Sequence, residues 1–204
     1  MDGSAGARRL VVASRNAGKV AEIRALLAGC GMEVIGIADL DGIPELDEPY
    51  DTFEANAHSK ALEVARHTGV AALADDSGLQ VDALDGRPGV HSSRYGDSDR
   101  QRIERLLAEL TGVPDERRSA RFVCVIVAAY QDGILGCWEG RCEGYIAHEP
   151  HGTAGFGYDP IFIYPPFGCT FAEVSTEEKN AVSHRGRALQ AMIADLPDLL
   201  AHLD

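Results

Sequence analysis

The sequence is organised around the stretch Val70-Ala71-Ala72-Leu73-Ala74-Asp75-Asp76-Ser77-Gly78. Its first four residues form a short apolar run, which is typical of a buried strand. Two acidic residues, a hydroxyl and a glycine follow at the point where this strand is expected to end. Ligands of α/β proteins gather outside the carboxyl ends of strands. The stretch therefore predicts a binding site or, because Asp, Ser and Gly are also turn residues, a solvated turn.

The neighbouring carboxylates of Asp75 and Asp76 point to a charged ligand. Adjacent carboxylates repel each other, so the pair requires a cation, a proton or full solvation. Mg²⁺ prefers oxygen ligands and is often bound together with the phosphates of a substrate. A magnesium ion that carries substrate phosphates would therefore satisfy both acidic residues.

The length and composition of the chain restrict its partners. The chain has 204 residues, which is the size of a single domain, with room for two lobes. It contains 19 Lys and Arg against 32 Asp and Glu, so its formal net charge is −13. A nucleic-acid polymer usually needs a basic face, so we expect no such partner. A single nucleotide is still allowed, because a metal, a few lysines and backbone N–H groups can meet its phosphates.

The N-terminus and the cysteines predict a cytoplasmic protein. Residues 1–8 are expected to form a flexible N-terminus, and they lack the basic-then-apolar order of a signal peptide. We expect no membrane partner, because no apolar run is long enough to cross a bilayer. The five cysteines form no CxxC pair and are odd in number, so we interpret them as reduced thiols.

A polar loop follows the first apolar run of the chain. Residues 10–13 predict a strand, and the apolar residues of 20–27 recur at helical spacing. The loop between them reads Ser14-Arg15-Asn16-Ala17-Gly18-Lys19. Backbone N–H groups at the start of a helix bind anions, and Lys19 adds a positive charge. The loop is not a P-loop, and the alternative interpretation of Lys19 is a solvated side chain.

An acidic loop comes next. It contains Asp47 and Glu48 and precedes a helix for which Asp51 is the expected N-cap. Asn56 and Lys60 lie four residues apart on that helix, so they share one stripe of its surface. Taken alone, this segment is best interpreted as a solvated acidic loop.

Two further segments carry chemistry near the C-terminus. The aromatic loop Phe156-Gly157-Tyr158-Asp159 could stack on a nucleobase, a contact worth about 1–3 kcal/mol in single-strand binding proteins, or could belong to the core. A last helix is predicted from its cap at Ser175 to Pro197. His184 and Arg185 are expected on the first turns of this helix.

Together these segments resemble the inosine triphosphate pyrophosphatase family of nucleotide hydrolases, the HAM1-like proteins. The resemblance is clearest in Asp75-Asp76-Ser77-Gly78-Leu79 and Pro88-Gly89-Val90-His91-Ser92-Ser93-Arg94-Tyr95. The block Phe53-Glu54-Ala55-Asn56-Ala57 with Lys60, the aromatic loop and residues 177–186 match further signatures of the family, in the same order. The family usually has Thr-Gly-Asn where this chain has Ser14-Arg15-Asn16.

The resemblance implies a fold and a reaction. The fold is α/β, with a mixed central sheet, flanking helices and two lobes around an active-site cleft, as in HAM1-like and Maf-like proteins. The reaction is the Mg²⁺-dependent hydrolysis of ITP, dITP and XTP to the monophosphate and pyrophosphate, which removes these nucleotides from the pool. The family is typically a homodimer.

The resemblance also implies the residues of the site. Asp76, Lys19 and Lys60 are the expected catalytic residues. The metal ligands are Asp76 and Glu48, although Asp47 is an alternative to Glu48. The expected substrate-binding residues share a place in one of the matching blocks: Ser14, Arg15, Asn16, Ala17, Gly18, Lys19, Ser77, Phe156, Gly157, Tyr158, Asp159, Lys179, His184 and Arg185.

Two other functions are open at this point. One is a Maf-like pyrophosphatase that acts on modified nucleotides. The other is a sensor that binds a nucleotide without hydrolysing it, which the presence of Asp76, Lys19 and Lys60 disfavours. Turnover of a panel of nucleotides would separate the three functions.

Overall fold

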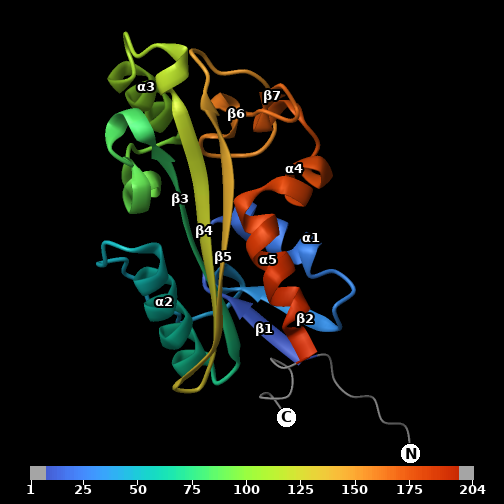
Figure 1. The fold of residues 1–204 in the computed structure, drawn as a ribbon. Helices are drawn as coiled ribbons and strands as arrows, with labels where there is room; N and C mark the ends of the chain where they lie inside the picture. The colour runs from blue at the N-terminus through green and yellow to red at the C-terminus, as the bar shows by residue number, and fades with distance from the viewer. Residues whose placement is uncertain (1–7, 198–204) are drawn as a thin grey trace, which may run out of the picture. The chain divides into compact units, whose positions relative to one another are not determined.

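The computed structural model describes residues 8–197, which form one mixed seven-stranded sheet with flanking helices (Figure 1). The sheet order is β2-β1-β3-β4-β5-β6-β7. β1 is parallel to β2 and β3, whereas β6 is antiparallel to β5 and β7. This arrangement confirms the predicted α/β class. The strands are β1 Arg8–Val12, β2 Met32–Gly36, β3 Ala71–Val81, β4 Ser119–Tyr130, β5 Gly133–Ile146, β6 Phe162–Tyr164 and β7 Cys169–Thr170.

The helices lie between and after these strands. They are α1 Ala17–Leu26, α2 Phe53–Thr68, α3 Asp99–Glu109, α4 Thr176–Val182 and α5 His184–Ala194. Within residues 8–197, no helix combines the length and the apolar character that a membrane crossing needs.

The chain divides into two compact units. Unit 1 comprises residues 1–75, 126–138 and 189–204, and unit 2 comprises residues 76–125 and 139–188. The borders fall inside β3, β4, β5 and α5, so each of these elements contributes to both units. The predicted active-site cleft stays a prediction. Arg8, which we assigned to a flexible N-terminus, is the first residue of β1, and residues 1–7 lie outside the described residues.

The sequence predicted that a strand ends at the acidic pair, but the strand continues through it. β3 continues through Asp75 and Asp76 to Val81. Two interactions explain this. The carboxylate of Asp75 forms an ion pair with Lys19, which neutralises one of the buried charges. Beyond the pair, Leu79 and Val81 are buried in the hydrophobic core of unit 2, and this burial stabilises the continued strand.

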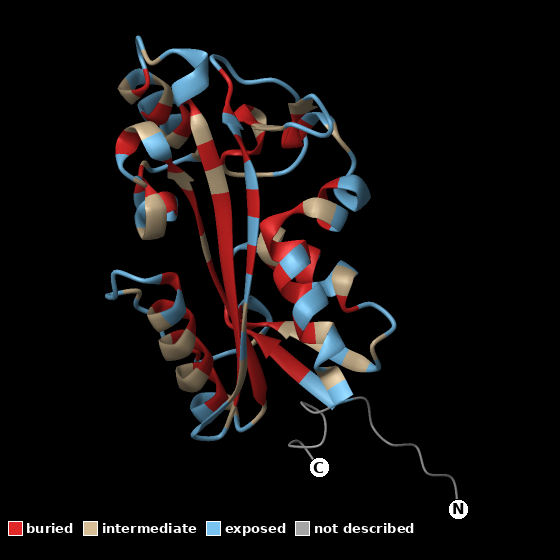
Figure 2. Cartoon of the chain, viewed as in Figure 1, coloured by how far each residue is buried: buried red, intermediate tan, exposed pale blue. Residues whose placement is uncertain are grey.

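The strands β3 and β4 are buried along most of their length (Figure 2). The apolar run of residues 121–130 predicts a central strand, and β4 is accordingly buried from Phe122 to Ala129. In unit 2, the ring of Phe122 contacts that of Phe162, with centroids 4.5 Å apart, and Phe162 in turn contacts Phe171 at 5.2 Å. These aromatic contacts form the core under the candidate base-binding loop described below.

Two helix boundaries differ from the predictions. α2 is capped by Thr52 rather than Asp51, because the Thr52 hydroxyl accepts a hydrogen bond from the Ala55 N–H at 3.2 Å. The predicted last helix is broken at Ser183, which has an extended backbone. The Ser183 hydroxyl accepts a hydrogen bond from the Gly186 N–H at 3.1 Å and so acts as a new cap. As a result, α5 begins at His184.

Arg118 is a buried residue whose removal tests the packing of unit 2. Its guanidinium donates hydrogen bonds to the carbonyl oxygens of Ile146, Leu110 and Ala147 at 2.8, 3.1 and 2.8 Å. We expect Arg118→Met to lower the free energy of unfolding by about 3 kcal/mol, because three buried carbonyls lose a partner. Such a loss corresponds to a melting temperature lower by about 6–12 °C, which calorimetry would measure.

Its exposed neighbour Arg117 offers a matched control. Arg117→Met is expected to change the free energy of unfolding by no more than about 0.5 kcal/mol. Equal melting temperatures for the two variants would show that the hydrogen bonds of Arg118 do not stabilise unit 2.

Candidate active site

Four side chains of unit 1 form a lysine–carboxylate cluster, which consists of Lys19, Glu48, Lys60 and Asp75. The Nζ atom of Lys60, on α2, lies 2.6 Å from Oε1 of Glu48 and donates a hydrogen bond of 3.0 Å to the backbone oxygen of Asp75. Lys19, on the first turn of α1, forms an ion pair with the carboxylate of Asp75. The cluster thus combines two ammonium groups with two carboxylates, and the side chains of Lys60 and Asp75 are only 6% and 0% exposed.

The predicted loop from Ser14 to Lys19 is shaped by its own polar side chains. The amide oxygen of Asn16 accepts a hydrogen bond from the Lys19 N–H at 3.2 Å, so Asn16 is the N-cap of α1. The hydroxyl of Ser14 accepts one from the Asn16 N–H at 3.2 Å. Ala17 and Gly18 are the first two residues of α1, where backbone N–H groups have no partner within the helix. The loop therefore presents a helix N-terminus of the kind that binds anions.

Arg15 connects two loops, a role that the sequence did not predict. Its guanidinium donates a hydrogen bond to the backbone oxygen of Ile43 at 2.8 Å. This contact ties the polar loop to the acidic loop that carries Glu48. Arg15 therefore positions a loop, and its predicted contact with the substrate stays a prediction.

Asn56 holds the other end of the acidic loop. Its side-chain amide donates to the Tyr50 backbone oxygen and accepts from the Tyr50 N–H, both at 3.0 Å. Glu48 is thus held between two fixed points, whereas Asp47 is exposed. The contact of Glu48 with Lys60 brings it into the cluster, and this favours Glu48 over Asp47 as the metal-site residue. Asn56 was recognisable in the sequence only as part of a family block, because its contact is with a backbone.

Asp76 lies next to this cluster in the chain. It is 4% exposed, and it is the first residue of unit 2, directly after Asp75, the last residue of the first segment of unit 1. The peptide bond between the two acidic residues therefore connects the lysine–carboxylate cluster to unit 2.

A second group of residues, all in unit 2, forms an aromatic–cation cluster of Phe156, Asp159, Lys179 and Arg185. Lys179 Nζ lies 2.6 Å from Oδ2 of Asp159, and both side chains are at most 4% exposed. The same ammonium lies 4.7 Å from the centroid of the half-buried Phe156 ring. The guanidinium carbon of Arg185 lies 5.7 Å from that centroid. Two cations thus flank one aromatic ring.

Asp159 also explains the glycine before Phe156. Its Oδ2 accepts a hydrogen bond of 2.9 Å from the Phe156 N–H. Gly155 has a φ of +74°, and a Cβ at this position would lie 2.1 Å from the same Oδ2. Only glycine allows this close approach. Gly157 is held in turn, because its N–H donates to Oδ2 of Asp99 at 2.7 Å.

Tyr158 lies beneath the aromatic loop. Its ring is 4% exposed and belongs to the hydrophobic core of unit 2. Its hydroxyl donates a hydrogen bond of 3.0 Å to the Ser92 backbone oxygen, and burial raises the pKa of Tyr158. This ring therefore packs beneath the loop, and its predicted contact with a purine stays a prediction. Phe156 is the more exposed of the two rings.

The residues at the start of α5 pack within unit 2. Arg185, only 1% exposed, donates a hydrogen bond of 3.0 Å from a terminal nitrogen to the hydroxyl of Ser77. The His184 ring stacks on Phe122, with centroids 4.6 Å apart and planes 12° apart. Ser77, one of the expected substrate-binding residues, thus contacts Arg185, and its predicted contact with the substrate stays a prediction.

The chain matches the model of the Ham1 family over residues 10–195. It is 51% identical to a dITP/XTP pyrophosphatase of Symbiobacterium thermophilum, covering 95% of this chain and 97% of the relative. It is 50% identical to one of Geobacter sulfurreducens, covering 92% and 95%. Among solved structures, a HAM1 protein from Coxiella burnetii matches with a TM-score of 0.84 and 42% identity, covering 94% of this chain and 99% of that one.

Proposed function

The chain belongs to the Ham1 family, and from this premise we propose that it hydrolyses the non-standard purine nucleotides ITP, dITP and XTP to the monophosphate and pyrophosphate. The observation that carries the proposal is the lysine–carboxylate cluster, in which Lys19 and Lys60 meet two carboxylates directly before Asp76. Ammonium groups held beside acidic residues suit a triphosphate and its metal ion. The relatives at about half identity, which are dITP/XTP pyrophosphatases, support the same reaction.

The residues present fit a magnesium ion. Glu48 and Asp76 supply carboxylate oxygens, which are the ligands that Mg²⁺ prefers. Asp76 is buried, and a buried carboxylate is stabilised by a nearby cation. We assign the metal to these two residues. When bound, Mg²⁺ would neutralise the phosphate oxygens and the charge that develops on the leaving pyrophosphate.

The lysine–carboxylate cluster and Asp76 then carry the reaction. Lys19 and Lys60 bind phosphate oxygens, assisted by the N–H groups at the start of α1. Asp76 orients a water molecule and accepts its proton as the water attacks the α-phosphorus. The bond between the α-phosphorus and the bridging oxygen breaks, and pyrophosphate leaves with that oxygen. Each turnover consumes one water and yields the monophosphate, pyrophosphate and a proton.

The aromatic–cation cluster is assigned to the base. A purine stacked on Phe156 would bring its position 6 near cationic donors, because Lys179 and Arg185 both lie close to that ring. Arginine and protonated lysine can only donate hydrogen bonds, so they match the 6-oxo group of hypoxanthine or xanthine and oppose the amino group of adenine. Lys179, one of the expected substrate-binding residues, is assigned to the base on these contacts. A homodimer in the cytoplasm, as the family implies, is part of the proposal.

A panel of nucleotides tests this function. Pyrophosphate release is measured with Mg²⁺ and ITP, dITP, XTP, GTP or ATP under identical conditions. The proposal requires the highest kcat/KM for ITP, dITP and XTP. Preference for a modified pyrimidine nucleotide would favour the Maf-like alternative, and binding without turnover would identify a sensor.

Arg185 is expected to contribute to the choice of base. We expect Arg185→Ala to lower kcat/KM for ITP by about 10–100-fold more than for ATP, because a donor opposite the 6-oxo group is lost. Steady-state kinetics on both substrates would measure the ratio. Arg187→Ala is the matched control, since Arg187 is exposed on the same helix. An unchanged ratio in folded Arg185→Ala would leave Arg185 with a packing role only.

A further inference from the structure

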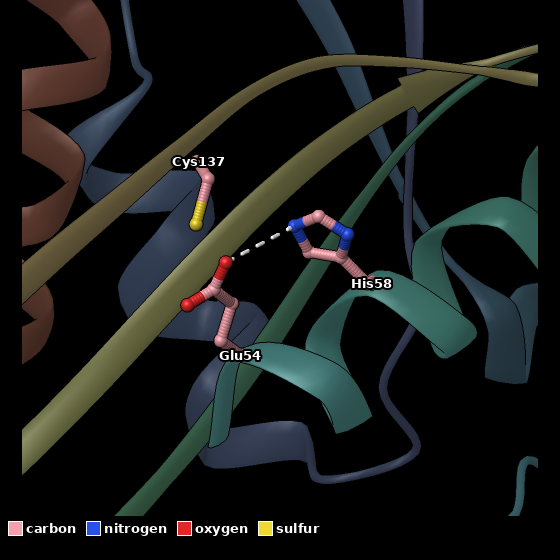
Figure 3. Close-up of side chains that lie close together, drawn as sticks. All are labelled: Glu54, His58 and Cys137. Carbon is pink, nitrogen blue, oxygen red and sulfur yellow. Dashed lines mark ion pairs between the residues drawn. The ribbon is translucent and has the colours of Figure 1, made fainter. Parts of the chain in front are cut away.

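We propose that unit 1 carries a second metal site, for Zn²⁺, formed by Glu54, His58 and Cys137 (Figure 3). One ligand atom from each residue, namely a carboxylate oxygen, a ring nitrogen and the sulfur, lies within 4.8 Å of the other two. Figure 3 shows the Cys137 thiol and the His58 imidazole both pointing toward the carboxylate of Glu54. None of the three residues belongs to the proposed nucleotide site.

The fold brings these residues together in a simple way. Glu54 and His58 are one helical turn apart on the first half of α2, so they lie on the same stripe of the helix. Cys137 lies on β5, where it precedes Trp138, whose indole N–H donates to Asp195 at 2.7 Å. Successive side chains of a strand point to opposite faces, so the thiol of Cys137 points away from the side that Trp138 occupies.

An ion pair connects α2 to the hairpin formed by β4 and β5. Nε of Arg66, near the end of α2, lies 2.7 Å from Oδ1 of Asp132, in the turn between β4 and β5. The helix therefore contacts the hairpin about two turns beyond His58. This contact, together with the cluster itself, makes the alignment of Glu54 and His58 with Cys137 a feature of the fold.

His58 supplies an independent sign of a missing ligand. Its Nε2 atom is buried and has no hydrogen-bond partner among the described residues. The nearest carboxylate oxygen, on Glu54, is 3.9 Å away, which is too far for a hydrogen bond. A buried polar atom without a partner destabilises a protein, and most buried polar atoms have a hydrogen-bond partner in the protein or in ordered water. A metal ion between the three residues would take the Nε2 lone pair.

The ligand types select the metal. A thiolate and an imidazole suit Zn²⁺, whereas Mg²⁺ favours oxygen ligands, so this site would not compete for the catalytic metal. In a tetrahedral zinc site, neighbouring ligand atoms are about 3.5 Å apart, given metal–ligand bonds of about 2.0–2.3 Å. The three atoms must therefore approach by about 1 Å, a change that the 68% exposed Glu54 side chain and the exposed Cys137 can make. Water would fill the fourth position.

Binding would join α2 to β5 within unit 1. α2 also carries Lys60 and Asn56, which contact Glu48 and Tyr50 of the acidic loop. A ligand that binds only the folded state of a protein raises the melting temperature of that protein. We therefore expect Zn²⁺ to stabilise the protein at concentrations that match its binding.

The test measures binding rather than activity. The metal-free full chain is dialysed against Zn²⁺ in the presence of excess Mg²⁺, and bound zinc is counted. Co²⁺ replaces Zn²⁺ in a second experiment, because a thiolate bound to Co²⁺ gives a charge-transfer absorption band. The variants are Cys137→Ser and His58→Ala. Their matched controls are Cys30→Ser, a partly exposed thiol of unit 1, and His67→Ala, an exposed histidine of α2.

We expect one Zn²⁺ per chain, a rise in melting temperature on its addition, and a thiolate–Co²⁺ band. Cys137→Ser and His58→Ala should each weaken binding at least about tenfold, whereas both controls should bind like the wild type. Zinc should also protect Cys137 from alkylation, while Cys142 stays unreactive because burial raises its pKa to about 11. A Zn²⁺ affinity that is the same in Cys137→Ser and the wild type, or a Co²⁺ complex without the thiolate band, would overturn the proposal.

Discussion

Asp76→Asn is expected to lower kcat for pyrophosphate release from ITP by at least about 1,000-fold, while the protein stays folded. The amide has nearly the shape of the carboxylate but neither its charge nor its basicity. It would therefore lose a proposed metal ligand and the group that accepts the proton of the attacking water. The buried position of Asp76 directly after the lysine–carboxylate cluster is the reason that we place these roles on it. Steady-state kinetics with saturating Mg²⁺ would measure the change.

Asp85→Asn is the control for this substitution. Asp85 is exposed in the turn that follows β3 and has a φ of +53°, which asparagine tolerates well. The control should retain wild-type kcat. If Asp76→Asn also kept near wild-type turnover with an unchanged melting temperature, Asp76 would not be the catalytic base.

Glu48→Gln is expected to raise the Mg²⁺ concentration for half-maximal rate by about 100-fold and to lower the rate at physiological Mg²⁺. Glutamine cannot supply the charge that binds the metal, and it also leaves Lys60 without the carboxylate that lies 2.6 Å away. Asp47→Asn is the matched comparison, because Asp47 precedes Glu48 in the same loop and is exposed. That variant should have a wild-type Mg²⁺ dependence.

Mg²⁺ titrations of both variants, with a chelator to set the zero point, would decide between the two acidic residues. A larger effect from Asp47→Asn would mean that the acidic loop presents a different carboxylate to the metal. Activity that persists in the presence of the chelator would contradict a magnesium requirement altogether.

The elements of this fold could be predicted where the signal is local. The uninterrupted apolar run of β4 predicted a buried central strand, and Ser175 with Glu178 predicted the start of α4, where both reciprocal hydrogen bonds are present. Local patterns failed where a distant partner decides the outcome. Asp75 and Asp76 have the composition of a turn, but an ion pair with Lys19 lets the strand continue through them.

The candidate site shows the same limit. Family blocks identified most of its residues, but not which residues contact each other. Lys179 could be grouped by charge with Lys19 and Lys60, and only the structure shows its ion pair with Asp159 beneath Phe156. A hydrogen bond to a backbone leaves no signature in either partner's residue type. Arg15, with its bond to the Ile43 oxygen, could therefore not be recognised as a loop-positioning residue.

The reaction itself is tested most directly by following the oxygen of water. ITP is hydrolysed with Mg²⁺ in oxygen-18-labelled water, and the products are separated and analysed by mass spectrometry. Attack on the α-phosphorus predicts equal amounts of inosine monophosphate and pyrophosphate, with the label only in the monophosphate. Label in pyrophosphate, or products that consist of inosine diphosphate and labelled phosphate, would contradict the mechanism and the proposed function with it.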